Sequence, residues 1–137
     1  MNRADLQTLA EERLVDSELL LTHARYGAAY YLAGYAVECA LKACIARLTK
    51  AEDFYDKLRA RKIFTHDLEE LVVHAHLEDV FAQTCKKNAQ FAINWARVNS
   101  WTEESRYDVR TKQEAEVLII AVRDPIHGVM QCIRQYW

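Results

Sequence analysis

The segment from residue 28 to residue 46 constrains the fold of this chain more than any other feature. It reads AAYYLAGYAVECALKACIA, and Glu38 and Lys42 are its only charged residues. Small side chains around a helix let neighbouring helices approach closely, so we expect the central helix of a small bundle. Glu38 and Lys42 share one helix face. They form either a satisfied core ion pair or dimer seam, which the pattern favours, or a wall of a functional cleft.

The composition predicts an all-α protein with a single domain over residues 1–137. The chain has only 3 glycines and 1 proline, which leaves few sites for the tight turns of a sheet of short strands. A formal net charge of -2 gives no general attraction to nucleic acid, so any RNA contact requires a local patch.

We expect a soluble, cytoplasmic protein. The N-terminal sequence has no apolar stretch of the kind found in secretory signals. The central segment is a poor membrane span because it contains Glu38 and Lys42 and is rich in Ala, Gly and Tyr. We therefore expect no contact with a membrane.

Hydrophobic periodicity and capping signals predict the helices. An amphipathic first helix is expected to end before Tyr26-Gly27, and Thr65 is expected to cap a third helix. Thr111 and Glu114 match a capping box that starts a late helix, which either kinks at Asp124-Pro125 or ends there before another begins. The expected helices cover residues 4–24, 28–46, 66–75, 77–98 and a stretch from 112 onward, with 99–110 irregular.

The four cysteines are expected to be small core residues of a reduced protein. Cys39, Cys44, Cys85 and Cys132 contain no CxxC pair and have no histidine at metal-ligand spacing. Cys39 and Cys44 are five residues apart and diverge on a helix. We therefore expect no metal, no cofactor and no disulfide.

Three sequence motifs carry a family resemblance. The run YYLAGYAVECALKA, followed by THDLEEL at residues 65–71 and ESRYD at residues 104–108, is similar to the HEPN domain family (higher eukaryotes and prokaryotes nucleotide-binding domain). The similarity spans most of the chain. It implies an up-and-down bundle of four to five helices that forms a homodimer, here with a kinked or broken last helix. It also implies a role in toxin–antitoxin pairs or phage defence, often beside a nucleotidyltransferase partner.

Many members of this family are metal-independent ribonucleases that carry an Arg, commonly followed by Asn or Asp, and then a His after about four to six residues. This chain offers Arg123, Asp124 and His127, with three residues between the Arg and the His. His127 would take the 2′-OH proton and Arg123 would hold the phosphate, if the helix continues through Pro125. The short spacing and the proline favour ordinary surface residues instead, so we leave open whether the chain is an enzyme.

Arg106 and Tyr107 are the leading candidates for contact with a ligand. A guanidinium offers a bidentate fork to phosphate, and a tyrosine ring stacks on a base. The resemblance associates a Glu-x-Arg-Tyr element with the branch that often lacks the ribonuclease pair. An equally supported alternative is that Arg106 pins the segment onto Glu38 or another core carboxylate. We expect Arg106 and His66 to be neighbours of Glu38 and Lys42.

A basic run before the third helix offers a second place for a phosphate backbone, although a solvated loop is favoured. It consists of Lys57, Arg59, Arg61 and Lys62. Arg61 and His66 have four residues between them, but they lie where the resemblance places no catalytic pair. Trp95, Trp101 and Trp137 are expected to be packing anchors. The candidate nucleotide- or RNA-binding residues are Arg106, Tyr107, His66, Lys42, Glu38, Arg59 and Arg61.

The leading functional hypothesis is a cytoplasmic HEPN-type protein of a toxin–antitoxin or phage-defence system that binds nucleotide or RNA. One alternative is a metal-independent endoribonuclease that uses Arg123 and His127. Another is a non-catalytic scaffold or dimerisation partner that docks a nucleotidyltransferase.

Overall fold

The computed structural model describes residues 1–49, 61 and 63–137, and this part of the chain contains helices and no β-strand. The helices are α1 (Arg3–Thr22), α2 (Tyr26–Leu48), α4 (Leu68–His74), α5 (Glu78–Lys87), α6 (Ala89–Asn99), the 3-10 helix η1 (Glu103–Tyr107), α7 (Lys112–Arg123) and α8 (Val129–Ile133). The all-α class is confirmed.

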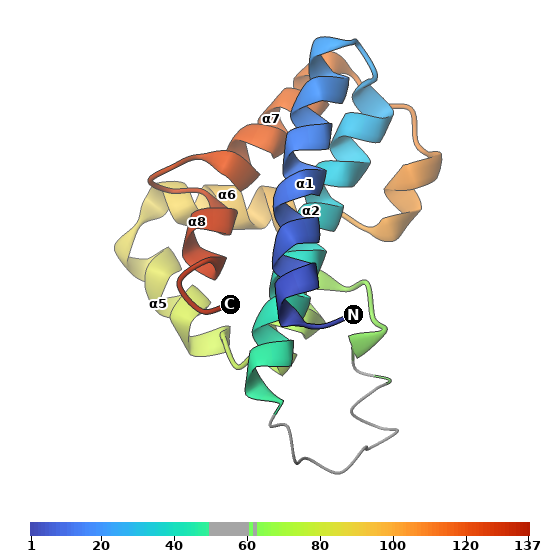
Figure 1. Cartoon of the computed structure of the whole chain (residues 1–137). Helices are drawn as coiled ribbons and strands as arrows, with labels where there is room; N and C mark the ends of the chain where they lie inside the picture. Colours follow the sequence, from blue (N-terminus) through green and yellow to red (C-terminus); the bar gives the residue numbers. More distant parts are fainter. Residues whose placement is uncertain (50–60, 62) are drawn as a thin grey trace.

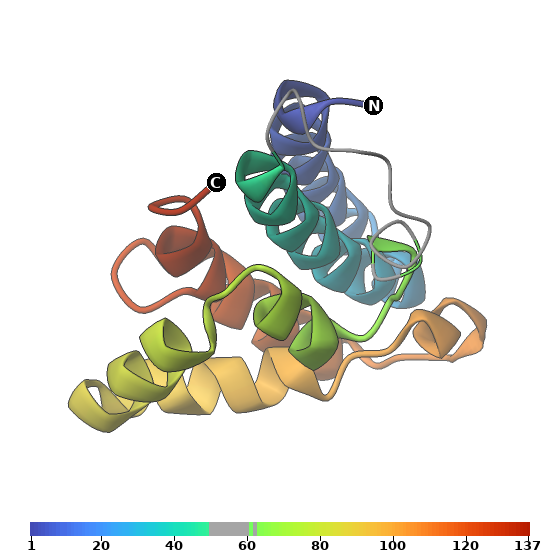
Figure 2. The same cartoon turned by 90° about the horizontal axis from the view of Figure 1, so that it is seen from below.

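Helix α2 is the centre of the fold (Figure 1). It forms an antiparallel hairpin with α1 and also contacts α4, η1, α7 and α8. Figure 2 shows α2 between α1 and the layer that contains α4 and α6. Residues such as Ala33, Val37, Ala40 and Ala43 are fully buried, because small side chains allow helices to approach α2 from several directions. The predicted central helix is therefore confirmed, two residues longer at each end.

The turn between α1 and α2 differs from the prediction. Tyr26 and Gly27 do not end the first helix, since both lie in the first turn of α2. Instead, Ala24 adopts a left-handed conformation with φ of 58°. The amide of Arg25 donates to the carbonyl of Leu20 at 2.8 Å, which closes a Schellman-type C-cap. The left-handed residue that ends the helix is an alanine, so the sequence has no glycine there to indicate the turn.

The start of α4 is also displaced from its predicted place. Thr65 does not cap a helix that begins at His66. Asp67 is the N-cap, and its carboxylate accepts a hydrogen bond from the Glu70 amide at 3.0 Å. The Thr65 hydroxyl accepts from the Asp67 amide at 3.1 Å and donates to the Glu70 carboxylate at 2.8 Å. His66 is thereby left in an extended connector, with its side chain free to reach across to α2.

The predicted helix over residues 77–98 is two helices. Asn88 is extended, with φ of -137° and ψ of 102°, and it ends α5. Its side chain then accepts from the Phe91 amide at 3.0 Å and caps α6. A single asparagine is compatible with a helix interior in sequence terms, but here its capping geometry breaks the helix.

The last helical region begins as predicted and is broken as predicted. Thr111 and Glu114 form the expected capping box at the start of α7. Helix α7 ends at Arg123, and the Asp124 carboxylate accepts from the amides of Ile126 and His127, both at 2.8 Å. One capped turn follows, and α8 then starts after Gly128.

Candidate functional site

One face of α2 organises the candidate site. Gly27, Tyr31, Gly34, Glu38 and Lys42 recur every three or four residues and so lie along one stripe of the helix, which we call the α2 stripe. The glycines of this stripe let the segment 99–110 lie directly on the helix. The end of the stripe that carries Glu38 and Lys42 meets the connector before α4 instead.

Trp101 fixes the first part of the segment 99–110 on α2. Its indole lies over Gly34, and a Cβ at that position would overlap the five-membered ring. The ring also stacks on Tyr31, with centroids 5.9 Å apart. Trp101 is 2% exposed, so the prediction that it is a packing anchor is consistent with its place in the core.

Arg110 fixes the other end of the segment. Its guanidinium donates to the carboxylates of Asp108 at 2.8 Å and Glu114 at 3.0 Å. It also lies over the ring of Tyr30 on α2, 4.1 Å from the centroid. These contacts, together with Asp108 beside Gly27, hold η1 between two attached ends. Arg110 carries no recognisable signal in the sequence, because its three partners are identified only once the segment is placed.

A chain of charged groups connects α2 to η1 through His66. Glu38 is 1% exposed and accepts from the Lys42 ammonium at 2.8 Å. His66 Nδ1 lies 2.9 and 3.1 Å from the two Glu38 oxygens, and His66 Nε2 lies 3.0 Å from a Glu103 oxygen. His66 was predicted to lie near Glu38 and Lys42, and the structure places it against the Glu38 carboxylate. Glu103 was missed, because its contact joins residues far apart in the chain with no local signal.

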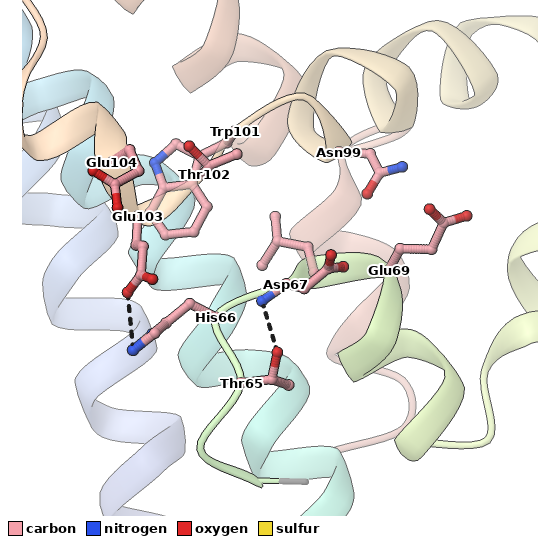
Figure 3. Close-up of a pocket in the computed structure, with 10 residues that line it drawn as sticks. Thr65, His66, Asp67, Glu69, Asn99, Trp101, Thr102, Glu103 and Glu104 are labelled. Atoms are coloured by element: carbon pink, nitrogen blue, oxygen red, sulfur yellow. Dashed lines mark hydrogen bonds and ion pairs between the residues drawn. The ribbon is translucent and has the colours of Figure 1, made fainter.

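A pocket of about 390 Å³ opens between the connector before α4 and η1 (Figure 3). The imidazole of His66, which contacts the buried carboxylate of Glu38, forms part of its wall. The lining carries four carboxylates and one imidazole, and so repels phosphate. The lining residues are Thr65, His66, Asp67, Leu68, Glu69, Asn99, Trp101, Thr102, Glu103 and Glu104.

Arg106 and Tyr107 are exposed on η1, next to the pocket. The guanidinium of Arg106 lies 4.9 Å from the centroid of the Tyr107 ring. The pKa of Arg106 is raised, first by Tyr107 and further by Tyr31 and Glu103, so the group stays fully charged. Arg106 forms no ion pair with any carboxylate that the structure describes. The alternative in which it pins the segment onto Glu38 is therefore wrong, since His66 occupies that carboxylate.

Arg123 and His127 face different partners. Arg123 donates to Glu18 of α1 at 3.1 Å, whereas His127 Nδ1 lies 2.7 Å from the side-chain nitrogen of Asn88. The Asn88 oxygen is already committed to the Phe91 amide, so its NH₂ group must face His127. The neutral imidazole, as assigned from these hydrogen bonds, carries its proton on Nε2. The Asp124 carboxylate is occupied by the turn, and accepting from the amides of His127 and Ile126 lowers its pKa.

The basic run is only partly within the described residues. Lys57, Arg59 and Lys62 lie outside them, while Arg61 is described and exposed. Arg61 and His66 are not brought together by any contact recorded between described residues, and His66 is committed to Glu38 and Glu103. The recorded contacts thus join Glu38, Lys42 and His66 to Glu103 of η1, the short helix that also carries Arg106 and Tyr107. Within the described part of the chain, Arg61, Arg123, Asp124 and His127 have no recorded contact with this set.

Three of the four thiols, those of Cys39, Cys44 and Cys132, are buried, and Cys85 is half-buried. Burial raises the pKa of Cys39 and Cys132 to about 11 and that of Cys44 to about 12, so all three stay protonated near neutral pH. The described part of the chain holds no group of three or more His, Cys, Asp or Glu side chains suited to a metal ion. Within that same part, no helix has the length and apolar character needed to cross a membrane.

Comparison with known proteins gave one match. A family model described as HEPN domain matches residues 4–127. No curated protein and no solved structure matched the chain. The matched range contains the α2 stripe, the pocket, η1, Arg123 and His127.

Proposed function

Because the chain belongs to the HEPN domain family, which comprises nucleotide-binding and ribonuclease-type domains, we propose that it binds RNA or a nucleotide through Arg106 and Tyr107. The observation that carries this proposal is the exposed guanidinium of Arg106 beside the Tyr107 ring, on a short helix whose two ends are attached to the core. The setting that we propose is a cytoplasmic toxin–antitoxin or phage-defence system.

Arg106 and Tyr107 are suited to different parts of a nucleotide. Arg106 offers two parallel N–H donors to a phosphate, and the Tyr107 ring offers a face for a base. The carboxylates of the pocket repel phosphate, so the backbone of a bound strand is expected to lie outside the pocket, along the exposed side of η1. Binding without strict sequence preference is expected, because stacking tolerates every base.

The ribonuclease alternative has less support within one protomer. A base for the 2′-OH needs a free nitrogen lone pair, and the His127 tautomer presents an N–H at Nε2. Arg123 is also turned toward Glu18 on α1. A second protomer would have to reposition both side chains before they could act on one phosphate.

The scaffold alternative concerns a different surface, which we call the α1–α7 face. Val15, Leu19 and Ile120 are each about half exposed, and the Glu18–Arg123 pair joins their two helices. We propose that this face forms a homodimer, because apolar side chains exposed together mark interaction surfaces. A nucleotidyltransferase partner would compete with the second copy for the same face.

Substitution of Arg106 tests the binding proposal. We expect Arg106→Ala to weaken the binding of a fluorescein-labelled single-stranded RNA by about 1 to 3 kcal/mol, because a charge-assisted bidentate contact is lost. Arg106→Lys should recover only part of the affinity, since an ammonium lacks the fork. The measurement is fluorescence anisotropy at fixed salt.

The matched control is Lys86→Ala, which removes an exposed cation from α5, away from η1 (Figure 1). Equal losses in the two alanine variants would mean that only net charge matters and would refute the Arg106 site. The same samples, incubated with RNA in EDTA, test the alternative. Cleavage that disappears in His127→Ala without a change in thermal stability would instead establish the ribonuclease.

A further inference from the structure

We propose that His66 is a pH-dependent clasp that holds η1, and with it Arg106, against the central helix. This inference rests on the proposed function for its consequence in binding, although the clasp itself is a property of the fold. His66 is the one described side chain that contacts both the buried carboxylate of α2 and a carboxylate of η1. It therefore connects the core to the ligand-contacting helix directly.

The protonation state of the His66 imidazole determines whether it can donate to both carboxylates or to only one. Both ring nitrogens face carboxylate oxygens, and an ionised carboxylate only accepts hydrogen bonds. An imidazolium donates a hydrogen bond to Glu38 at 2.9 Å and at the same time forms an ion pair with Glu103, whose oxygen lies 3.0 Å from Nε2. A neutral imidazole has one N–H, so it satisfies one carboxylate and turns a lone pair toward the other.

Burial decides which contact survives the loss of the proton. Glu38 is 1% exposed, and Lys42 donates only to its Oε1, so leaving Oε2 without the His66 donor is costly. The Glu103 side chain is 36% exposed and can exchange the imidazole for water. The single remaining N–H should therefore stay on Glu38, and the bond to Glu103 should be the one that is released as the pH rises.

The other charged groups near His66, Lys42 and Asp67, are engaged in contacts of their own. On α2, the Lys42 ammonium lies 2.8 Å from Glu38 Oε1 and forms an ion pair with it. Asp67, next in the chain, has its carboxylate committed to the Glu70 amide. The imidazolium thus faces two acidic partners on separate elements, and its charge state decides whether they are joined.

Release of Glu103 affects only the middle of the segment. Trp101 on Gly34 and Arg110 between Asp108 and Glu114 keep the two ends in place. Loss of the His66 bond should therefore loosen η1 locally, without unfolding, and let Arg106 sample more orientations. Weaker binding follows, because more side-chain freedom is then lost when RNA binds.

The first test follows the clasp without any ligand. In NMR spectra of the full chain recorded from about pH 5.5 to 8, the amides of Glu103 to Tyr107 should shift together with the imidazole of His66. Glu103→Gln should uncouple them, whereas Glu104→Gln, one residue further along η1, should not. Amides that ignore the His66 titration in the wild type would overturn the clasp.

The second test follows RNA binding. Wild-type affinity should fall by about twofold to fivefold across the same range, the size expected for one partly exposed charge-assisted contact. His66→Gln keeps an N–H near the Nε2 position and should make the affinity independent of pH; the wild-type pH dependence persisting in this variant would overturn the clasp.

The two tests separate the two ideas. Coupled amide shifts with no RNA binding at any pH would refute the proposed function and leave the clasp standing. Binding that depends on Arg106 but not on pH would refute the clasp and leave the proposed function standing.

Discussion

Gly34 is the residue that allows the site to exist, because the Trp101 indole occupies the space of its missing side chain. A glycine inside a long helix normally lowers stability relative to alanine by about 0.5 to 1 kcal/mol. Here that cost is offset by the close approach of the segment 99–110. The sequence showed Gly34 as an interruption in an alanine-rich helix, but it did not show what fills the gap.

We predict that Gly34→Ala destabilises the protein by about 1 to 3 kcal/mol, although helix propensity alone favours alanine. The sign of the change is therefore diagnostic. Urea unfolding followed by circular dichroism measures it. Gly27→Ala is the comparison, because its Cβ would meet the Asp108 carbonyl at the milder distance of 3.1 Å. A stabilised Gly34→Ala variant would show that Trp101 does not rest on α2 as described.

At the scale of elements, the sequence predicted the side-chain cap of α7, but it missed the caps at Asp67 and Asn88 and the helix ends made by backbone geometry. The Thr111–Glu114 capping box was read correctly from four residues. In contrast, α1 and α4 are each followed, two residues after their last residue, by Ala24 and His76, which both adopt left-handed conformations usually reserved for glycine. Neither alanine nor histidine is a stop signal in a sequence, because residues other than glycine seldom adopt this conformation.

The left-handed Ala24 gives a prediction at this scale. Ala24→Gly should stabilise the α1–α2 hairpin by about 1 kcal/mol, because glycine adopts φ of 58° without steric cost. Ala28→Gly is a matched control, exposed like Ala24 but within α2, and it should destabilise by about 0.5 to 1 kcal/mol. Differential scanning calorimetry of both variants decides the matter; shifts of the same sign would contradict the assigned turn.

For the whole molecule, the sequence pointed to several residues of the candidate site but not to all of the contacts between them. Glu38 and Lys42 were recognisable as a pair because their spacing is local, and the family resemblance drew attention to His66. The partner of His66 on η1 was not recognisable, since it depends on how the segment 99–110 crosses α2. For the same reason, Arg106 was equally compatible with a core contact and with solvent until the fold was known.

The oligomeric state is a prediction for the whole molecule. We expect a homodimer through the α1–α7 face, so Leu19→Glu should yield monomers when the molar mass is measured by light scattering. Thermal stability at low concentration should change little, because Leu19 is 54% exposed. Ile93→Glu, on the exposed side of α6, serves as the control and should leave the mass unchanged. A wild-type protein that is monomeric at high concentration would refute the dimer.

The α2 stripe also sets how the length of this chain can vary. A helix turns by about 100° for each residue, so one residue inserted between Gly34 and Glu38 would rotate the two glycines away from the two charged groups. Contacts with Trp101 and with His66 could then not be made together. An insertion or deletion within this part of α2 would therefore disrupt one of the two sets of contacts, unless its length returns the stripe residues to the same helix face. A substitution there affects only the contacts of the residue that is replaced.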